Sequence, residues 1–132
     1  MLLGFKKRFS TAIESGAKTH TIRDFRKRIP KPGETIHCYE ALRTKHCRLL
    51  GRWVCSNVQT IRITGFGQVA IADQAADQLG VGLLDPDEKE QLARRDGFES
   101  FADMLKFWEG RLPFAGMIVH WDFNRPVNGE KK

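Results

Sequence analysis

The stretch GAKTHTIRDFRKR, residues 16–28, places a lysine and two threonine hydroxyls directly before a dense run of cations. Its middle alternates Thr19 and Thr21 with His20 and Ile22, and this period-two pattern with β-branched residues predicts a strand. Neither face of that strand is apolar. A strand with polar groups on both faces is either an exposed sheet edge or the wall of a binding site.

These residue types are also the ones that bind nucleic acids. Cations contact phosphates, a flat ring stacks on a base, and a hydroxyl donates a hydrogen bond to a base edge. We expect His20 or a nearby aromatic residue to stack, and Thr19 or Thr21 to donate the hydrogen bond. The residues predicted to contact a nucleic acid are Lys18, His20, Arg23, Arg26, Lys27 and Arg28.

Charge is distributed unevenly along the chain. Residues 1–62 hold fourteen lysines and arginines against four acidic residues, whereas residues 63–132 hold eight against twelve. A basic half of this kind favours a polyanionic partner. We therefore expect RNA, a nucleoside or a nucleotide as ligand, with a merely solvated basic face as the alternative.

The length of 132 residues suits one domain, predicted over residues 1–125 with a flexible tail at 126–132. Cys38, Cys47 and Cys55 are odd in number and lack the spacing of a zinc site, so we expect reduced thiols, no metal and no cofactor. No segment is apolar over a membrane-spanning length, and we expect a cytoplasmic monomer.

The elements that must hold these side chains can be read from apolar periodicity and from glycine and proline. Gly16 is predicted to end the first helix, and the longest strand is predicted to bend at Gly51 or around 56–57. A basic loop is expected at 24–34. Strands are expected at 2–5, 18–23, 35–42, 47–64, 66–72 and 114–123, and helices at 6–16, 73–80, 85–97 and 98–110.

This order of elements predicts an α+β fold, most simply a small β-barrel flanked by helices. The last expected helix has an apolar stripe that indicates packing against the sheet, and the three tryptophans are expected in the core, with stacking on a base as the alternative. The stripe consists of Phe98, Phe101, Met104, Leu105 and Trp108.

Several segments, in a fixed order, resemble the ASCH family of the PUA-like superfamily. After a strand and a helix that ends in glycine come KTHTIR at 18–23, KPGETIHCY at 31–39, RRDGFESFADML at 94–105 and MIVHW at 117–121. Together they cover nearly the whole chain. The resemblance implies a PUA-like β-barrel with a cleft beside the first helix, and binding of RNA or a modified nucleoside.

One branch of that family consists of amidohydrolases that remove acetate from N4-acetylcytidine. Their functional lysine and threonine lie in a K-T-x-T-I-R segment, so the resemblance carries these roles to Lys18 and Thr21. Their functional glutamate lies just before the later helix, where this chain has Asp96. Thr21 would attack the acetyl carbonyl, neutral Lys18 would take the hydroxyl proton, and Asp96 would orient the lysine or manage the leaving amine.

Two demands follow for this chemistry. In a regular strand Lys18 and Thr21 would point to opposite faces, so the chain must bulge between them or Lys18 must belong to the turn after Gly16. The lysine pKa must also fall from about 10.4 to about 7. We expect an ASCH-type RNA or modified-nucleoside binding domain, with the amidohydrolase as the alternative.

Overall fold

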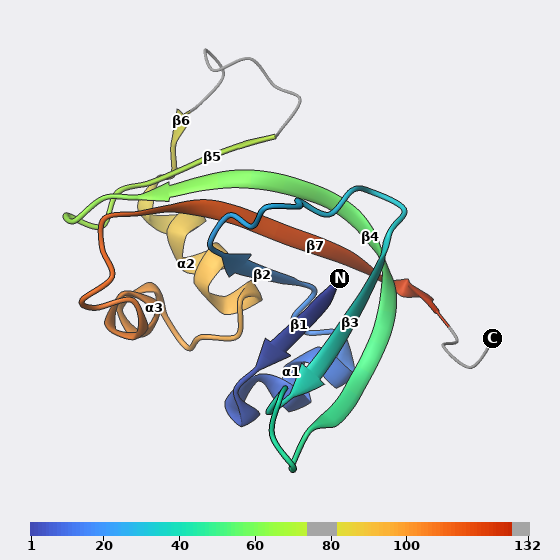
Figure 1. Cartoon of the computed structure of the whole chain (residues 1–132). Coiled ribbons are helices and arrows are strands. Elements are labelled where there is room, and N and C mark those ends of the chain that lie inside the picture. The colour runs from blue at the N-terminus through green and yellow to red at the C-terminus, as the bar shows by residue number, and fades with distance from the viewer. Residues whose placement is uncertain (74–81, 128–132) are drawn as a thin grey trace.

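The structure is a computed structural model that describes residues 1–73 and 82–127. Its described residues form an α+β fold, in which one strongly curled sheet of seven strands arches over short helices as a half-open barrel (Figure 1). The α+β class and the curled sheet flanked by helices confirm the coarse prediction from the sequence. None of the described helices is long and apolar enough to span a membrane.

The elements follow the predicted order with small shifts of their ends, except that the short strand Gly82–Leu83 was not predicted. Residues 24–34 form no helix or strand, as predicted for the basic loop, whereas the helix expected at 73–80 lies almost wholly outside the described residues. The strands are β1 Leu2–Phe5, β2 His20–Arg23, β3 Thr35–Glu40, β4 Arg48–Ile63, β5 Val69–Asp73, β6 Gly82–Leu83 and β7 Phe114–Pro126. The helices are the 3-10 helix η1 Lys7–Phe9, then α1 Ser10–Ser15, α2 Pro86–Arg95 and α3 Phe101–Phe107.

The long strand β4 produces the curl. Its first half pairs with β3 and its second half with β5, while β7 runs antiparallel along it and also pairs with β2. The ladder with β3 is irregular opposite Gly51, and the ladder with β7 shifts register between Cys55 and Asn57. Both predicted bend positions are therefore used, because each irregularity adds local twist to the strand.

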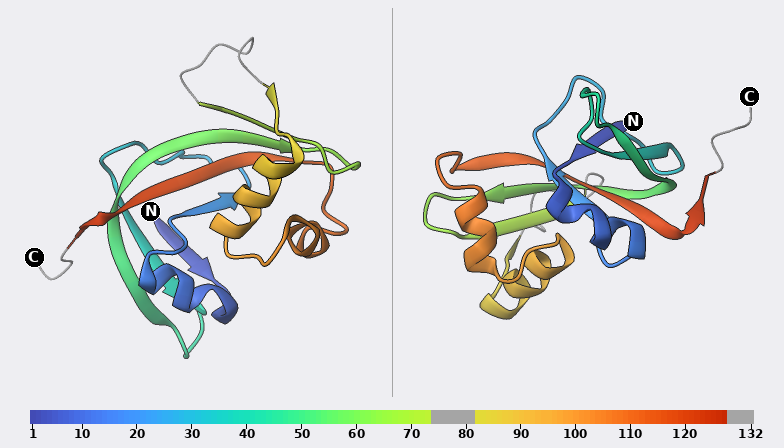
Figure 2. Two further views of the ribbon diagram at one scale, coloured as in Figure 1. Left: turned by 180° about the vertical axis from the view of Figure 1, so that it is seen from behind. Right: turned by 90° about the horizontal axis from the view of Figure 1, so that it is seen from below.

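The hydrophobic core fills the concave side of the sheet. Trp53 and Trp121 stack there with ring centroids 6.1 Å apart, and Trp108 is only 3 % exposed, so all three tryptophans are buried as expected. The stripe of the last helix is buried as predicted, except for the half-buried Leu105. Two views show α1 and the α2–α3 pair under the arch with β2 between them (Figures 1 and 2).

The C-terminal end of β7 corrects one boundary. Pro126 is still part of the strand, and the backbone N–H of Val127 donates to the carbonyl of Arg52 at 2.8 Å. The first two residues of the predicted tail 126–132 are thus held by the sheet, because the ladder between β4 and β7 continues past the apolar segment. Residues 128–132 lie outside the described part of the chain.

Candidate active site

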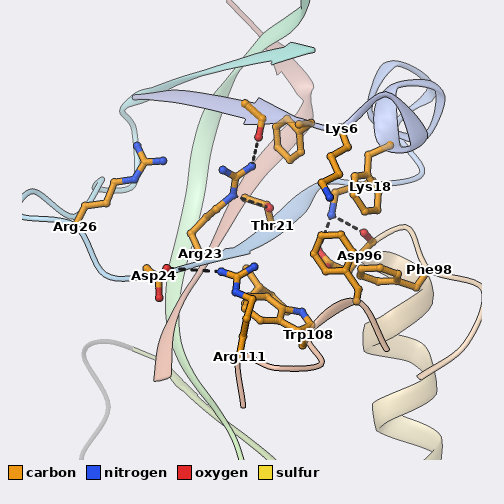
Figure 3. Close-up of a pocket in the computed structure, with 15 residues that line it drawn as sticks. Lys6, Lys18, Thr21, Arg23, Asp24, Arg26, Asp96, Phe98, Trp108 and Arg111 are labelled. Atoms are coloured by element: carbon orange, nitrogen blue, oxygen red, sulfur yellow. Dashed lines mark hydrogen bonds and ion pairs between the residues drawn. The ribbon is translucent and has the colours of Figure 1, made fainter. Parts of the chain in front are cut away.

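A cavity of about 360 Å³ opens beneath the sheet, between β1, β2 and the segments that flank α3 (Figure 3). This volume falls in the range of roughly 300–1,000 Å³ that is usual for small-molecule sites. Its walls combine aromatic rings with charged and hydroxyl side chains. Lys18, Thr21 and Asp96, the three residues predicted to act in catalysis, all line it.

Lys18 reaches the cavity from the turn that precedes β2. Helix α1 ends at Gly16, which has a left-handed backbone with a φ of 86°. The backbone N–H of Lys18 then donates to the carbonyl of Ala12 at 2.9 Å, and β2 begins only at His20. Lys18 and Thr21 therefore do not share a regular strand, and this is why both can face one cavity.

Asp96 is placed by the end of α2. The N–H groups of Gly97 and Phe98 donate back to the carbonyls of Arg94 and Ala93, which is the Schellman pattern that ends a helix. Gly97 has a φ of 98°, and a Cβ atom at this position would meet Phe9 at 2.8 Å. The tight turn brings Asp96 against the lysine that enters from the other side of the cavity.

The two side chains form a buried pair. Nζ of Lys18 donates to Oδ1 of Asp96 at 2.5 Å and to the main-chain carbonyl of Asp96 at 2.5 Å. Only 2 % of the Lys18 side chain and 7 % of the Asp96 side chain are exposed. The shorter acid therefore reaches the lysine directly, as its position in the tight turn allows.

Burial shifts the pKa of both members of this pair towards the neutral form. Loss of hydration lowers the pKa of Lys18 and raises the pKa of Asp96, while the attraction between the two charges opposes both shifts without cancelling them. The nearby guanidinium of Arg23 lowers the lysine pKa further. Both shifts make the ion pair easier to neutralise than an exposed one, so Lys18 can act as a base and Asp96 as an acid more readily than at the surface.

Thr21 lies on the same cavity wall but is hydrogen-bonded to Arg23. Its Oγ1 accepts a hydrogen bond from Nε of Arg23 at 3.2 Å, and Nη2 of Arg23 donates to the carbonyl of Gly4 at 2.6 Å. The hydroxyl proton of Thr21 must therefore point away from Arg23. Among the described residues no hydrogen bond joins Thr21 to Lys18, so the two side chains share the cavity without being directly linked.

His20 is not where a stacking residue must be. It is only 3 % exposed, its ring centroid lies 5.3 Å from that of His120 on the paired strand, and it does not line the cavity. Its Nε2 lies 3.4 Å from Oδ1 of Asp96, and burial followed by the charge of Lys18 keeps its pKa well below 6.5. His20 is thus a neutral core residue with no exposed ring face to offer a base.

The cations of the basic loop separate into different positions. Arg26 lines the cavity, with its Nη1 3.3 Å from the carbonyl of Leu2. Arg28 instead donates two hydrogen bonds to the carboxylate of Glu34, at 2.9 and 2.6 Å, and Lys27 is exposed away from the cavity lining. Of the three loop residues predicted to contact a nucleic acid, the structure brings only Arg26 to the cavity.

Several cavity residues were not identified as site residues from the sequence. Trp108 was expected in the core, with stacking on a base as the alternative, and its buried ring lies on the cavity wall with the guanidinium of Arg111 4.4 Å from its centroid. Arg111 comes three residues after Trp108, a proximity that could have indicated the pair. The remaining aromatic rings of the lining are Phe5, Phe9, Phe98 and Phe107.

Comparison of the chain with protein-family models, curated proteins and solved structures gave no match. Within residues 1–73 and 82–127, no three His, Cys, Asp or Glu side chains gather closely enough to hold a metal ion. The chemistry of this site must therefore be argued from the described side chains themselves.

Proposed function

We propose that this chain is an ASCH-type domain with a PUA-like fold that binds a modified nucleoside in the cavity and hydrolyses an N-acyl group from its base, as in N4-acetylcytidine. The observation that carries the proposal is the buried pair of Lys18 and Asp96 on the wall of a cavity that also holds Thr21. The ASCH resemblance of the sequence gives the same three residues these roles.

A buried ion pair is a poor way to stabilise a fold. Removing two charges from water costs several kcal/mol per ion, and apolar side chains of similar volume are often at least as stabilising. Groups with strongly shifted pKa values that face a cavity are typical of active sites. The position of Lys18 and Asp96 is therefore better explained by chemistry than by stability.

The reaction needs a nucleophile, a base and an acid. Thr21 Oγ attacks the acetyl carbonyl while the neutral amine of Lys18 takes the hydroxyl proton. The bond between the acetyl carbon and the exocyclic nitrogen of the nucleobase then breaks, and the Lys18–Asp96 pair gives this nitrogen a proton. The acetyl group stays on Thr21 as an ester. Water then attacks the ester with the same pair as base, which releases acetate and restores the hydroxyl.

The aromatic walls suit a flat, uncharged group beside this machinery. The rings of Phe9 and Phe98 pack edge to face at 5.4 Å, and those of Phe98 and Phe107 lie 5.3 Å apart. Trp108 adds a further ring to the lining. Aromatic side chains of this kind bind nucleobases through stacking and edge contacts.

The direct test is acetate release from N4-acetylcytidine by the purified protein. We expect Lys18→Ala, Thr21→Ala and Asp96→Asn to abolish release, and Thr21→Ser to retain part of it because the hydroxyl remains. Thr11→Ala, which removes an exposed hydroxyl from α1, is the matched control and should behave as wild type. Acetate release that survives Thr21→Ala would contradict the role of Thr21 as the nucleophile. If the wild type binds the nucleoside without releasing acetate, the chain is a binding domain and not a hydrolase.

A second function, RNA binding without hydrolysis, is favoured by exposed cations of the loop at 24–34. Arg26 and Lys27 are both exposed and have no carboxylate within 4.0 Å among the described residues. Replacing both with alanine should reduce the slope of log affinity against log salt by about one to two, since each phosphate contact contributes roughly 0.7–0.9. An unchanged slope would exclude this loop from phosphate contact.

A further inference from the structure

The cavity has two chemically different ends. Lys18 and Asp96 lie at one end, Arg26 lies at the other, and Thr21 and Arg23 lie between them (Figure 3). The Lys18–Asp96 end is surrounded by the phenylalanine rings and carries no net charge as a pair. The rest of the cavity beyond Thr21, which we call the arginine end, comprises Arg23, Arg26, Arg111 and Asp24.

Arg23 has unused donors at this end. A guanidinium carries five N–H groups, and in Arg23 Nε donates to Thr21 while Nη2 donates to the carbonyl of Gly4. Both acceptors are neutral, and among the described residues no carboxylate lies within 4.0 Å of Arg23. A largely buried cation with spare donors and no counterion is ready to receive an anion.

The other cations of this end increase its positive charge. Burial, followed by repulsion from Arg26, lowers the pKa of Arg23 to about 10, so Arg23 and Arg26 are close enough to disfavour each other. Arg111 approaches from the opposite wall, where its guanidinium is stacked on Trp108. An anion between them would relieve this repulsion, and the stacked arginine is already oriented before it binds.

Among the described residues, Asp24 supplies the one carboxylate of the arginine end, and its charge does not neutralise the three arginines. Its Oδ2 lies 3.7 Å from Nη2 of Arg111, with 74 % of the Asp24 side chain and 51 % of the Arg111 side chain exposed. Exposed ion pairs at this distance contribute little to stability, so a bound anion can take the place of Asp24 beside Arg111. Three arginines against one aspartate leave a formal charge of two, which matches the charge of about −1.5 to −2 on a phosphate monoester at neutral pH.

We propose that the arginine end binds a phosphate on the ligand's ribose, so that the substrate of this cavity is a base-modified nucleoside monophosphate rather than a neutral nucleoside. This inference rests on the proposed function for the identity of the base. A phosphodiester of RNA would present the same oxygen atoms with a single negative charge, and the experiment separates the two sources.

The experiment compares cytidine ligands that carry no phosphate, a phosphate monoester or a phosphodiester. Binding of cytidine, cytidine 5′-monophosphate and a cytidine dinucleotide without a terminal phosphate is measured by calorimetry on the wild type, and kcat/KM for acetate release is measured on N4-acetylcytidine and its 5′-monophosphate. We expect the monophosphate to bind at least about tenfold more tightly than the nucleoside, since its charged phosphate accepts hydrogen bonds from arginine that cytidine cannot form.

Two variants locate the phosphate. Arg26→Ala should lower the affinity for the monophosphate much more than the affinity for cytidine, and so remove most of the preference between them. Lys31→Ala removes an exposed cation from the same loop that does not line the cavity, and should change neither affinity. If both variants lose the preference for the monophosphate equally, the phosphate is attracted by the overall positive charge of the loop and not by Arg26. This result would overturn the proposal.

The remaining outcomes distinguish this inference from the proposed function. Equal affinity for cytidine and its monophosphate overturns the inference, even where acetate is released. A monophosphate preference that depends on Arg26 supports the inference even where no acetate is released, in which case the hydrolysis fails alone. A dinucleotide that binds more tightly than the monophosphate, with the same Arg26 dependence, would assign the phosphate to RNA and contradict the monoester.

Discussion

Replacing Lys18 with methionine would leave the carboxylate of Asp96 buried without its ammonium partner. Both side chains are more than nine-tenths buried, so water cannot compensate the lost contact. His20, 3.4 Å from the carboxylate, cannot replace the lysine because its pKa lies well below 6.5 and its ring stays neutral. Removing one member of a buried pair typically costs about 3–5 kcal/mol, and we expect a loss of unfolding free energy of this size at pH 7.

The double variant Lys18→Met/Asp96→Leu removes both charges and keeps an apolar volume in the same place. We expect it to recover most of that loss, since buried pairs replaced by apolar residues are often equally stable. The main-chain carbonyl of Asp96 loses its lysine donor in the single and double variants alike, so this cost cancels between them. All these variants should be inactive.

The assay is urea unfolding followed by tryptophan fluorescence. For Lys18→Met the penalty should shrink as the pH falls, because burial raises the pKa of Asp96 above 3.8 and the variant removes the lysine attraction that opposes this rise, so that Asp96 takes up a proton on folding more readily than in the wild type. Stability of this variant relative to wild type is therefore lost as the pH rises from 3.8 through the folded-state pKa. The free energy of unfolding is measured for Lys18→Met, for Asp96→Leu and for the double variant. A loss in the double variant equal to the sum of the losses in the two single variants would refute the coupling of Lys18 and Asp96.

Two further predictions concern the elements around the cavity. Gly97→Ala places a Cβ atom 2.8 Å from the ring of Phe9 on a backbone with a φ of 98°, and should cost at least about 1–2 kcal/mol in urea unfolding; an unchanged midpoint would contradict the tight turn. The hydrogen bonds from Arg28 lower the pKa of Glu34 to about 2, so the stability they contribute is present above about 4.5 and is lost as the pH falls towards about 2. Arg28→Ala should raise the Glu34 pKa towards 4.5 in a carboxyl NMR titration, and no change would refute the pairing.

Local sequence signals predicted the elements well because they depend on neighbouring residues. Gly16 ended α1 as expected, and this also decided between the two alternatives for Lys18, since the turn after the glycine holds it. Asp85 and Pro86 begin α2 with a complete capping box. The bends of β4 coincide with Gly51 and the residues around 56–57, where the ladder is irregular.

The errors arose where distant residues decide the environment. His20 is polar in the sequence, yet pairing of β2 with β7 places it against His120 in the core. Arg28 was grouped with its cationic neighbours; it is paired with Glu34, and its contact with a nucleic acid stays a prediction.

The acid of the site shows the same limit. Counting methylenes suggests that aspartate stands about 1 Å further back than glutamate at Asp96, and that Asp96→Glu would improve the site. This would hold only if the backbone at position 96 were placed as it is in an enzyme with glutamate there. The turn at Gly97 brings Asp96 to hydrogen-bond distance of Lys18, so lengthening this buried side chain would crowd the pair. Such a turn can be anticipated from the D-G-F sequence, but its direction relative to Lys18 requires the tertiary structure.

The proposed hydrolysis depends most directly on the ability of Lys18 to lose its proton inside the cavity. An NMR titration of the Lys18 amine, assigned by comparison with Lys18→Met, measures this in the wild-type protein. We predict a pKa clearly below the ordinary value of 10.5, because burial outweighs the attraction of Asp96. A pKa at or above 10.5 would mean that Asp96 holds a permanent ammonium, and it would contradict the role of Lys18 as a base.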